Sequence, residues 1–265
     1  MKSVWLRITD IDLQSSRICV DIAPRATADF LPRLERFVSR CNLEGIRGVD
    51  IFYNPDTDTN DIQRITRFAA ARKLRRPVAG ISRFDPGRSV GRGYNRTRFR
   101  FSGDPKADSN LTTGSGESTT YRIAAEGINN AVENINKVVA IVGAAMELDP
   151  RSALQLRLCI YELSTNTVEH ATFPTDNCQI NIVIKFDRSR AWVEYSDNSD
   201  LFPTITSSNA GLVGRNISTG RKRGLGLYMI NRLSSDFCYE RVDGCNTSSF
   251  SLEISRIKLE TQKGG

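Results

Sequence analysis

One stretch of apolar residues at helical spacing, Ser152 to Ala171, constrains the fold of this chain more than any other. Its sequence, SALQLRLCIYELSTNTVEHA, predicts a helix with two apolar flanks. The first flank holds Leu156, Ile160 and Leu163, and the second holds Leu154, Leu158 and Tyr161. Arg157 and Ser164 fall together on the side that we expect to face solvent.

Two polar residues of this helix, Glu162 and Asn166, are four positions apart and share one line between the apolar flanks. The pattern therefore predicts a carboxylate and a carboxamide that point inward. Burying a carboxylate costs free energy unless another group pairs with it. Glu162 and Asn166 are thus the first candidates for chemistry, and the alternative is a satisfied polar pair or cap with a structural role only.

Composition narrows the class of protein. The chain has 265 residues, of which 39% are hydrophobic and 25% charged, as in ordinary globular proteins. We expect a cytoplasmic protein without a membrane span, because the longest apolar runs are short and the N-terminus carries acids. The six cysteines form no CxxC pair and there is one histidine, so we expect buried thiols and no metal site built from side chains alone.

Charge and composition predict two units. The net charge is +7, and the basic surplus lies in the first 110 residues. Residues 102–118 are rich in Ser, Gly, Asp and Thr, which is typical of a linker. We therefore expect a basic α/β domain over residues 1–104, a linker over 105–117 and a second domain over 118–260.

Hydrophobic periodicity predicts alternating strands and helices, and hence an α/β fold in both units. In the first unit we expect strands at 4–13, 17–22, 48–53 and 77–82, and helices at 27–41 and 60–74. In the second we expect strands at 119–125, 179–186, 191–196, 237–242 and 248–254, and further helices at 128–146 and 224–233.

Residues 84–101 are rich in arginine, glycine and aromatic side chains. Arginine interleaved with aromatic residues is one pattern that binds nucleic acid. We favour instead a solvated loop followed by a strand whose arginines face water. An acidic protein partner ranks second and nucleic acid last.

Three patches of the second unit carry the candidate chemistry. The first is Glu162 with Asn166, suited to magnesium shared with phosphates. The second, Asp197-Asn198-Ser199, follows a strand and offers an acceptor for an exocyclic amine. The third is the run from Arg223 to Leu227, a glycine pair at the start of a helix, where backbone N–H groups attract anions. Each patch alone is weak.

In this order the patches resemble the N, G1 and G2 boxes of the GHKL ATPase superfamily, which includes gyrase and the histidine kinases. The text ELSTNTVEHA, VEYSDNSDLF and GLGLYMINRLSSDFCYERVDG is most similar to the bacterial anti-sigma-factor serine kinases, over about residues 118–257. The resemblance implies a Bergerat-type α/β sandwich, with a mixed sheet covered by helices and ATP bound between them.

The resemblance also implies residue roles. Asn166 would hold Mg²⁺ on the phosphates and Glu162 would act as general base. Asp197 would bind the adenine amino group, with Ser199 in its G1 box and Thr247 beside it. The phosphate-binding set would be Arg223, Gly224, Leu225, Gly226 and Leu227, with residues 201–223 as the ATP lid.

The chain departs from the family pattern at two positions. Ser199 stands where the G1 box has glycine, and Asn246 stands where glycine precedes Thr247. If the first position needs positive φ or close approach to the base, Ser199 is expected to lower nucleotide affinity. Asparagine tolerates left-handed backbone, so the second departure is milder.

The function implied is that of an ATP-dependent serine/threonine kinase that phosphorylates or sequesters a protein partner. The only histidine, His170, lies inside the N box, so autophosphorylation on histidine is not expected. The partner implied is a STAS-type anti-anti-sigma factor or a sigma factor, and a homodimer is allowed. The alternative is a non-catalytic switch gated by nucleotide, with nucleic-acid binding as a third hypothesis.

The first unit itself has the element order of the STAS fold of anti-anti-sigma factors. Their phosphorylated residue lies at the turn that is Pro55 to Asn60 here. The usual Asp-Ser-Ser-Gly sequence is absent, and generic α/β is the alternative.

Overall fold

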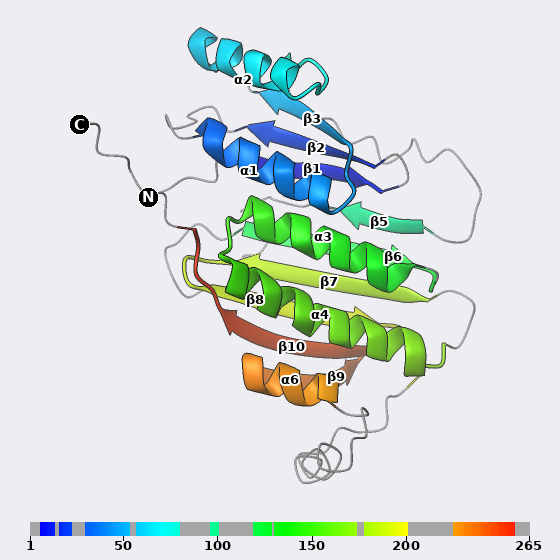
Figure 1. The fold of residues 1–265 in the computed structure, drawn as a ribbon. Helices are drawn as coiled ribbons and strands as arrows, with labels where there is room; N and C mark the ends of the chain where they lie inside the picture. Colours follow the sequence, from blue (N-terminus) through cyan, green and yellow to red (C-terminus); the bar gives the residue numbers. More distant parts are fainter. Residues whose placement is uncertain are drawn as a thin grey trace.

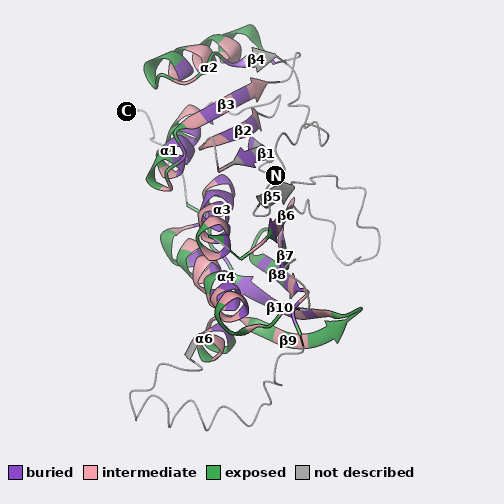
Figure 2. Ribbon diagram, turned by 90° about the vertical axis from the view of Figure 1, so that its right-hand side faces the viewer, coloured by how far each residue is buried: buried purple, intermediate pink, exposed green. Residues whose placement is uncertain are grey.

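The chain folds into two β-sheets that carry all of their helices on one side (Figures 1 and 2). The computed structural model describes residues 6–13, 16–22, 30–53, 57–79, 96–100, 119–128, 130–173, 178–200 and 225–257. Within these ranges the sheets have four and six strands. In Figure 1 the helices cross the front of the sheets in the order α2, α1, α3, α4 and α6.

The N-terminal sheet has the strand order β1-β2-β3-β4. Its strands are β1 (Leu6–Asp12), β2 (Arg17–Ile22), β3 (Gly48–Tyr53) and β4 (Val78–Ala79). The first pair is antiparallel and the other two are parallel, because α1 (Phe30–Leu43) and α2 (Thr59–Ala71) serve as crossovers. These elements confirm the α/β class expected of this half.

The C-terminal sheet has the order β5-β6-β7-β8-β10-β9. Its strands are β5 (Arg96–Arg100), β6 (Thr119–Glu126), β7 (Gln179–Phe186), β8 (Arg190–Asp197), β9 (Ser235–Val242) and β10 (Cys245–Glu253). Every neighbouring pair is antiparallel, whereas we expected a mixed sheet. The helices α3 (Ala131–Ala145), α4 (Pro150–His170) and α6 (Leu225–Leu233) cover one face, as a GHKL-like α/β sandwich requires.

The alternation of side chains along the C-terminal strands decides which residues face the helices. Buried and exposed residues alternate along β7 and β8, so every second residue points toward the helical layer. Asp197, the last residue of β8, is buried and therefore lies on the helix-facing side. The strand register thus places a carboxylate under α4.

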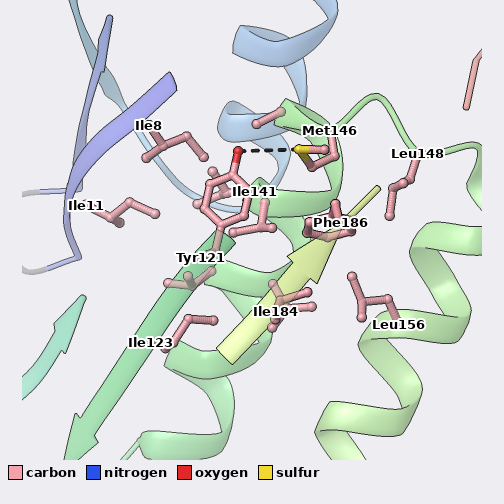
Figure 3. Packing of buried hydrophobic residues seen from close by; sticks show 14 of the residues in the cluster. Ile8, Ile11, Tyr121, Ile123, Ile141, Met146, Leu148, Leu156, Ile184 and Phe186 are labelled. Carbon is pink, nitrogen blue, oxygen red and sulfur yellow. Dashed lines mark hydrogen bonds between the residues drawn. The ribbon is translucent and has the colours of Figure 1, made fainter. Parts of the chain in front are cut away.

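One hydrophobic core runs through both halves of the chain (Figure 3). Ile8 and Ile11 of β1 lie beside Tyr121 of β6 in this core. The Tyr121 hydroxyl donates to the sulfur of Met146 over 3.5 Å, and its ring meets Phe186 edge to face at 5.9 Å between centroids. The two sheets therefore share their packing and do not bury separate cores.

Ion pairs between helices join the same two halves. Arg33 of α1 donates to both carboxylate oxygens of Glu147, over 2.7 and 2.5 Å, and Glu147 lies in the turn between α3 and α4. Arg157 of α4 donates to Glu44, just after α1, over 3.3 Å. Since Arg33 is buried, its pairing with Glu147 fixes α1 against the C-terminal helices.

Strand β5 belongs to the C-terminal sheet, where it pairs with β6, although it precedes the residues that we expected to form the linker. Residues 105–117 lie outside the described residues, as do 84–95 of the arginine-rich segment. The boundaries 1–104, 105–117 and 118–260 stay a prediction. The strand expected at the end of the arginine-rich segment is present.

The long helix α4 buries one of the two apolar flanks that its sequence predicts, but not the other. The flank of Leu156, Ile160 and Leu163 is buried, as expected. Ser164, expected to face solvent, is 0% exposed, whereas Leu154 of the second apolar flank is 64% exposed. The Ser164 hydroxyl donates to the Ile160 carbonyl oxygen over 2.8 Å, which satisfies the hydroxyl inside the core.

The turn that we compared with the STAS phosphorylation site is only partly described. Pro55 and Asp56 lie outside the described residues. Thr57 is buried, and Asp58 caps α2 by accepting from the Asn60 backbone N–H over 2.8 Å. The STAS resemblance stays a prediction. Among the helices that the structure describes, none is long and apolar enough to span a membrane.

Candidate functional site

Helix α4 delivers two candidate side chains, and one that was not predicted, to one end of the C-terminal sheet. It begins at Pro150 behind Asp149, whose carboxylate accepts from the Ser152 backbone N–H over 2.9 Å. Glu162, Asn166 and Thr167 then fall in its last three turns. Thr167 is buried in the core, and Glu162 and Asn166 are half-buried at its border. The helix itself contacts β8 and β10 of the sheet and also α6.

The Asp197 carboxylate is the most heavily bonded group of the site. It is 4% exposed. Its Oδ1 accepts from the Ser199 backbone N–H over 3.0 Å, from the Ser199 hydroxyl and from Asn246 Nδ2 over 3.1 Å. Its Oδ2 accepts from the Thr167 hydroxyl over 3.3 Å. Four donors therefore compensate the burial of this carboxylate.

Asn246 joins this carboxylate to the edge of the sheet. In the register of β8 and β10 it lies directly opposite Asp197. Its Oδ1 accepts from the Tyr239 hydroxyl and from Arg241 Nη1, each over 2.8 Å. Arg241 also donates to the Ser199 carbonyl oxygen over 3.0 Å. The network thus runs from α4, through Asp197, to β9.

Thr247 does not occupy the place expected of it beside Asp197. It pairs with Ser196 in the strand register, one position away from the pair formed by Asn246 and Asp197. Because side chains alternate along a strand, the Thr247 side chain points to the face of the sheet that carries no helices. The hydroxyl that contacts Asp197 comes instead from Thr167 of α4.

Ser199 fits its position without backbone strain. It is absent from the described non-glycine residues with positive φ, so the position does not need the left-handed region that glycine favours. Ser199 is 0% exposed, and its hydroxyl bonds to the carboxylate two residues earlier. The cost that we expected from positive φ is therefore not incurred.

Glu162 lies against the start of α6. A Cβ atom added at Gly226 would lie 3.1 Å from the Glu162 carboxyl carbon and closer still to Oε2. A larger residue at 226 would therefore require the Glu162 side chain to move or the two helices to separate. Burial raises the pKa of Glu162 above the usual value of a glutamate, and the nearby Glu169 carboxylate raises it further.

Asn166 lies one turn beyond Glu162 on the same line of α4. Carboxylate and amide oxygens of this kind are hard ligands that suit Mg²⁺, which also keeps phosphate oxygens and water in its shell. No cluster of three His, Cys, Asp or Glu side chains occurs among the described residues. The Asn166 amide oxygen therefore fits an ion held jointly with phosphates.

The remaining candidates are described only in part. Arg223, Gly224 and the expected lid, 201–223, lie outside the described residues. Leu225 is the first residue of α6, and Leu227 is half-buried against the core. The structure therefore places Gly226 and Leu227 beside α4 and leaves the phosphate-binding run before them as a prediction.

Two further groups surround Asp197. Burial raises the pKa of the Tyr195 hydroxyl, with the Asp197 carboxylate adding to the increase. Burial also raises the pKa of the Cys178 thiol to about 11. Both groups are therefore neutral at physiological pH.

Sequence reasoning missed Thr167, Tyr239 and Arg241, and treated Asn246 only as a departure from the family pattern. Thr167 directly follows Asn166 in the sequence, and its side chain lies on the side of α4 that faces the sheet. Asn246 pairs with Asp197 in the register of β8 with β10, which the alternation of side chains along one strand does not specify. The roles of Tyr239 and Arg241 depend on the β9–β10 register, which the sequence does not specify.

Residues 126–252 match the family model described as a histidine kinase-like ATPase domain. The matched segment begins at the end of β6 and ends in β10, so it contains Glu162, Asn166, Asp197 and Gly226. No curated protein matches the chain.

Proposed function

We propose that the chain is a regulatory serine/threonine kinase of the anti-sigma-factor type. The proposal is supported by the match of residues 126–252 to a histidine kinase-like ATPase domain of the GHKL type, which implies ATP binding. Its substrate is a hydroxyl group on a regulatory protein, of the STAS anti-anti-sigma class. Binding without transfer would sequester a sigma factor by the same surface.

The observation that carries the proposal is the position of Glu162. Its carboxylate is half-buried, has a raised pKa and lies against Gly226 at the start of α6, beside the expected phosphate site. A raised pKa brings a carboxylate closer to the value at which a general base works well near neutral pH. Asn166, one turn away, supplies the amide oxygen for Mg²⁺.

The proposed transfer is a single displacement. Glu162 accepts the proton of the partner's hydroxyl while that oxygen bonds to the γ-phosphorus of ATP. The bond from phosphorus to the β–γ bridging oxygen breaks, and ADP leaves. When bound, Mg²⁺ would neutralise negative charge on the phosphates. Asp197 holds the adenine through its amino group and takes no part in proton transfer.

Phosphoryl transfer from labelled ATP to candidate STAS proteins tests the proposal. We expect label on a serine or threonine of the partner with wild type and a loss of about 100-fold or more with Glu162→Gln. Glu253→Gln, at an exposed position of β10, is the matched control and keeps the activity. No transfer to any partner by the wild type, or full transfer by Glu162→Gln, would contradict the kinase.

A non-catalytic switch is the second candidate, and the contrast between Asp197 and Glu162 favours it. Asp197 has four hydrogen-bond donors, whereas no side-chain hydrogen bond joins Glu162 to a described residue. The group proposed to bind the nucleotide is therefore held in place without any contribution from the group proposed for catalysis. The switch predicts that ATP raises the unfolding temperature, that Asp197→Asn abolishes this rise, and that no phosphate is transferred or released.

A further inference from the structure

We propose that Ser199 and Asn246 form a positioning pair that holds Asp197 with its Oδ1 occupied by the protein and its Oδ2 directed to the nucleobase. The inference rests on the proposed role of Asp197 in binding adenine. It assigns a joint purpose to the two residues at which the chain departs from the glycines of its family.

The division of labour between the two carboxylate oxygens is the first observation. Oδ1 accepts from the backbone and hydroxyl of Ser199 and from Asn246. Oδ2 accepts only from the Thr167 hydroxyl among the described residues, over a longer distance of 3.3 Å. A carboxylate oxygen offers about two acceptor directions. Oδ2 therefore retains capacity for an amino group, and Oδ1 does not.

The second observation is that the two departures contact each other. Asn246 Nδ2 donates to the Ser199 hydroxyl oxygen over 2.9 Å, and that hydroxyl in turn donates to Asp197 Oδ1. Asn246 and Ser199 are 3% and 0% exposed. Because the Ser199 hydroxyl accepts from one partner and donates to the other, its orientation depends on Asn246.

The third observation fixes the orientation of the Asn246 amide. Arg241 carries donors only, so the amide atom that it contacts over 2.8 Å must be the oxygen. The Tyr239 hydroxyl donates to the same oxygen. The NH₂ group must then face Asp197, since a flipped amide would place its NH₂ against the Arg241 guanidinium and its oxygen against the Asp197 carboxylate. Tyr239 and Arg241 of β9 thus fix the orientation of the Asn246 amide.

The consequence is selectivity for the base. An occupied Oδ1 prevents the carboxylate from rotating to offer either oxygen, so one acceptor stands at one place before ligand arrives. Preorganised acceptors recognise a donor with less loss of side-chain entropy. The pair should therefore strengthen binding of a purine that bears a 6-amino group and leave binding of a purine without that group nearly unchanged.

The experiment compares ATP with purine riboside triphosphate, which lacks the 6-amino group, by calorimetric titration. Wild type should prefer ATP. For Asn246→Ala we expect ATP affinity to fall about 10-fold, with affinity for the analogue changed less than about 2-fold. Asn181→Ala, an exposed asparagine on β7, is the matched control and keeps the preference.

Ser199→Ala is the milder variant, because it retains the backbone N–H bond to Asp197. We expect it to lower ATP affinity about 3-fold, and the double variant to bind no more weakly than Asn246→Ala alone, since the two groups act as one. Melting temperatures measured without nucleotide identify a variant that has not folded. If Asn246→Ala is such a variant, Ser199→Ala decides the question by the same ratio of affinities.

The possible failures are distinguishable. If wild type and Asp197→Asn bind both triphosphates with the same ratio, Asp197 does not contact the amino group and the proposed site is wrong. If Asp197→Asn removes the preference while folded Asn246→Ala or Ser199→Ala retains it, only the positioning pair is wrong. Equal loss of affinity for both triphosphates in these variants also overturns the pair.

Discussion

The two ends of the candidate site are built in opposite ways. At the base end, Asp197 is buried and bonded to donors from three elements of the fold. At the phosphate end, Glu162 and Asn166 are half-buried, and their side chains make no hydrogen bond to the described residues. If Asp197 binds the base and Asn166 binds the phosphates through Mg²⁺, as proposed, the base pocket is assembled in advance and the polar groups of the phosphate pocket are left for the ligand.

The largest expected effect follows from removing the charge at the base end. Asp197→Asn replaces one acceptor oxygen by a donor, so we expect ATP affinity to fall by about 10- to 100-fold, the range for losing a hydrogen bond to a charged group. The loss should be the same with Mg²⁺ and with a chelator. Asn166→Ala is the contrasting variant, since its loss should require Mg²⁺. If the two variants lost the same ATP affinity in the absence of Mg²⁺, the proposed difference between the two ends of the site would be wrong. Calorimetry measures both.

The next effect concerns the close contact at the phosphate end. In Gly226→Ala, the new methyl group meets the Glu162 carboxylate, so α4 and α6 must separate or Glu162 must rotate. We expect a loss of about 1–3 kcal/mol in the free energy of unfolding, measured with urea. Gly244→Ala is a poor control because φ is +82° there, whereas Gly143→Ala meets only ordinary contacts. An unchanged stability would show that Glu162 is free to move aside.

The smallest effect is on pH dependence. A base must be deprotonated, so the transfer rate should fall on acidification through the raised pKa of Glu162, above the usual range of a glutamate. Stability has the opposite sign. A raised pKa in the folded state means that the protonated form is favoured, so stability decreases as pH rises from the unfolded to the folded value. Glu162→Gln should remove both dependences, as rate profiles and urea titrations can show.

The sequence predicts the elements of this fold better than their associations. The bounds of β3 and β7 agree with the expected strands 48–53 and 179–186, because alternating apolar residues mark them locally. Strand β5 could not be assigned to the second sheet, because its pairing with β6 spans residues that carry no pattern. The buried face of α4 was misjudged at Ser164, since a hydroxyl that bonds to its own helix no longer behaves as a polar residue.

For the site, sequence reasoning identified the main polar residues but missed those that hold Asp197 in place. Glu162, Asn166 and Asp197 stand out because polar side chains interrupt apolar patterns. Asn246 and Thr167 act through neighbours on other elements, which requires the register of β8 with β10 and the rotation of α4 over the sheet. Such partners depend on tertiary structure, and a one-residue change of register would have replaced Asn246 by Thr247.

The shared core of Figure 3 also bears on how such a chain changes over generations. Ile8 and Ile11 pack against Tyr121, and Arg33 is paired with Glu147. Each half therefore buries apolar and charged side chains against the other. A gene fragment that encoded residues 119–257 alone would expose the apolar and charged surface that contacts the N-terminal half. The halves are therefore expected to be inherited together, with a substitution on one side of this contact matched by a substitution on the other.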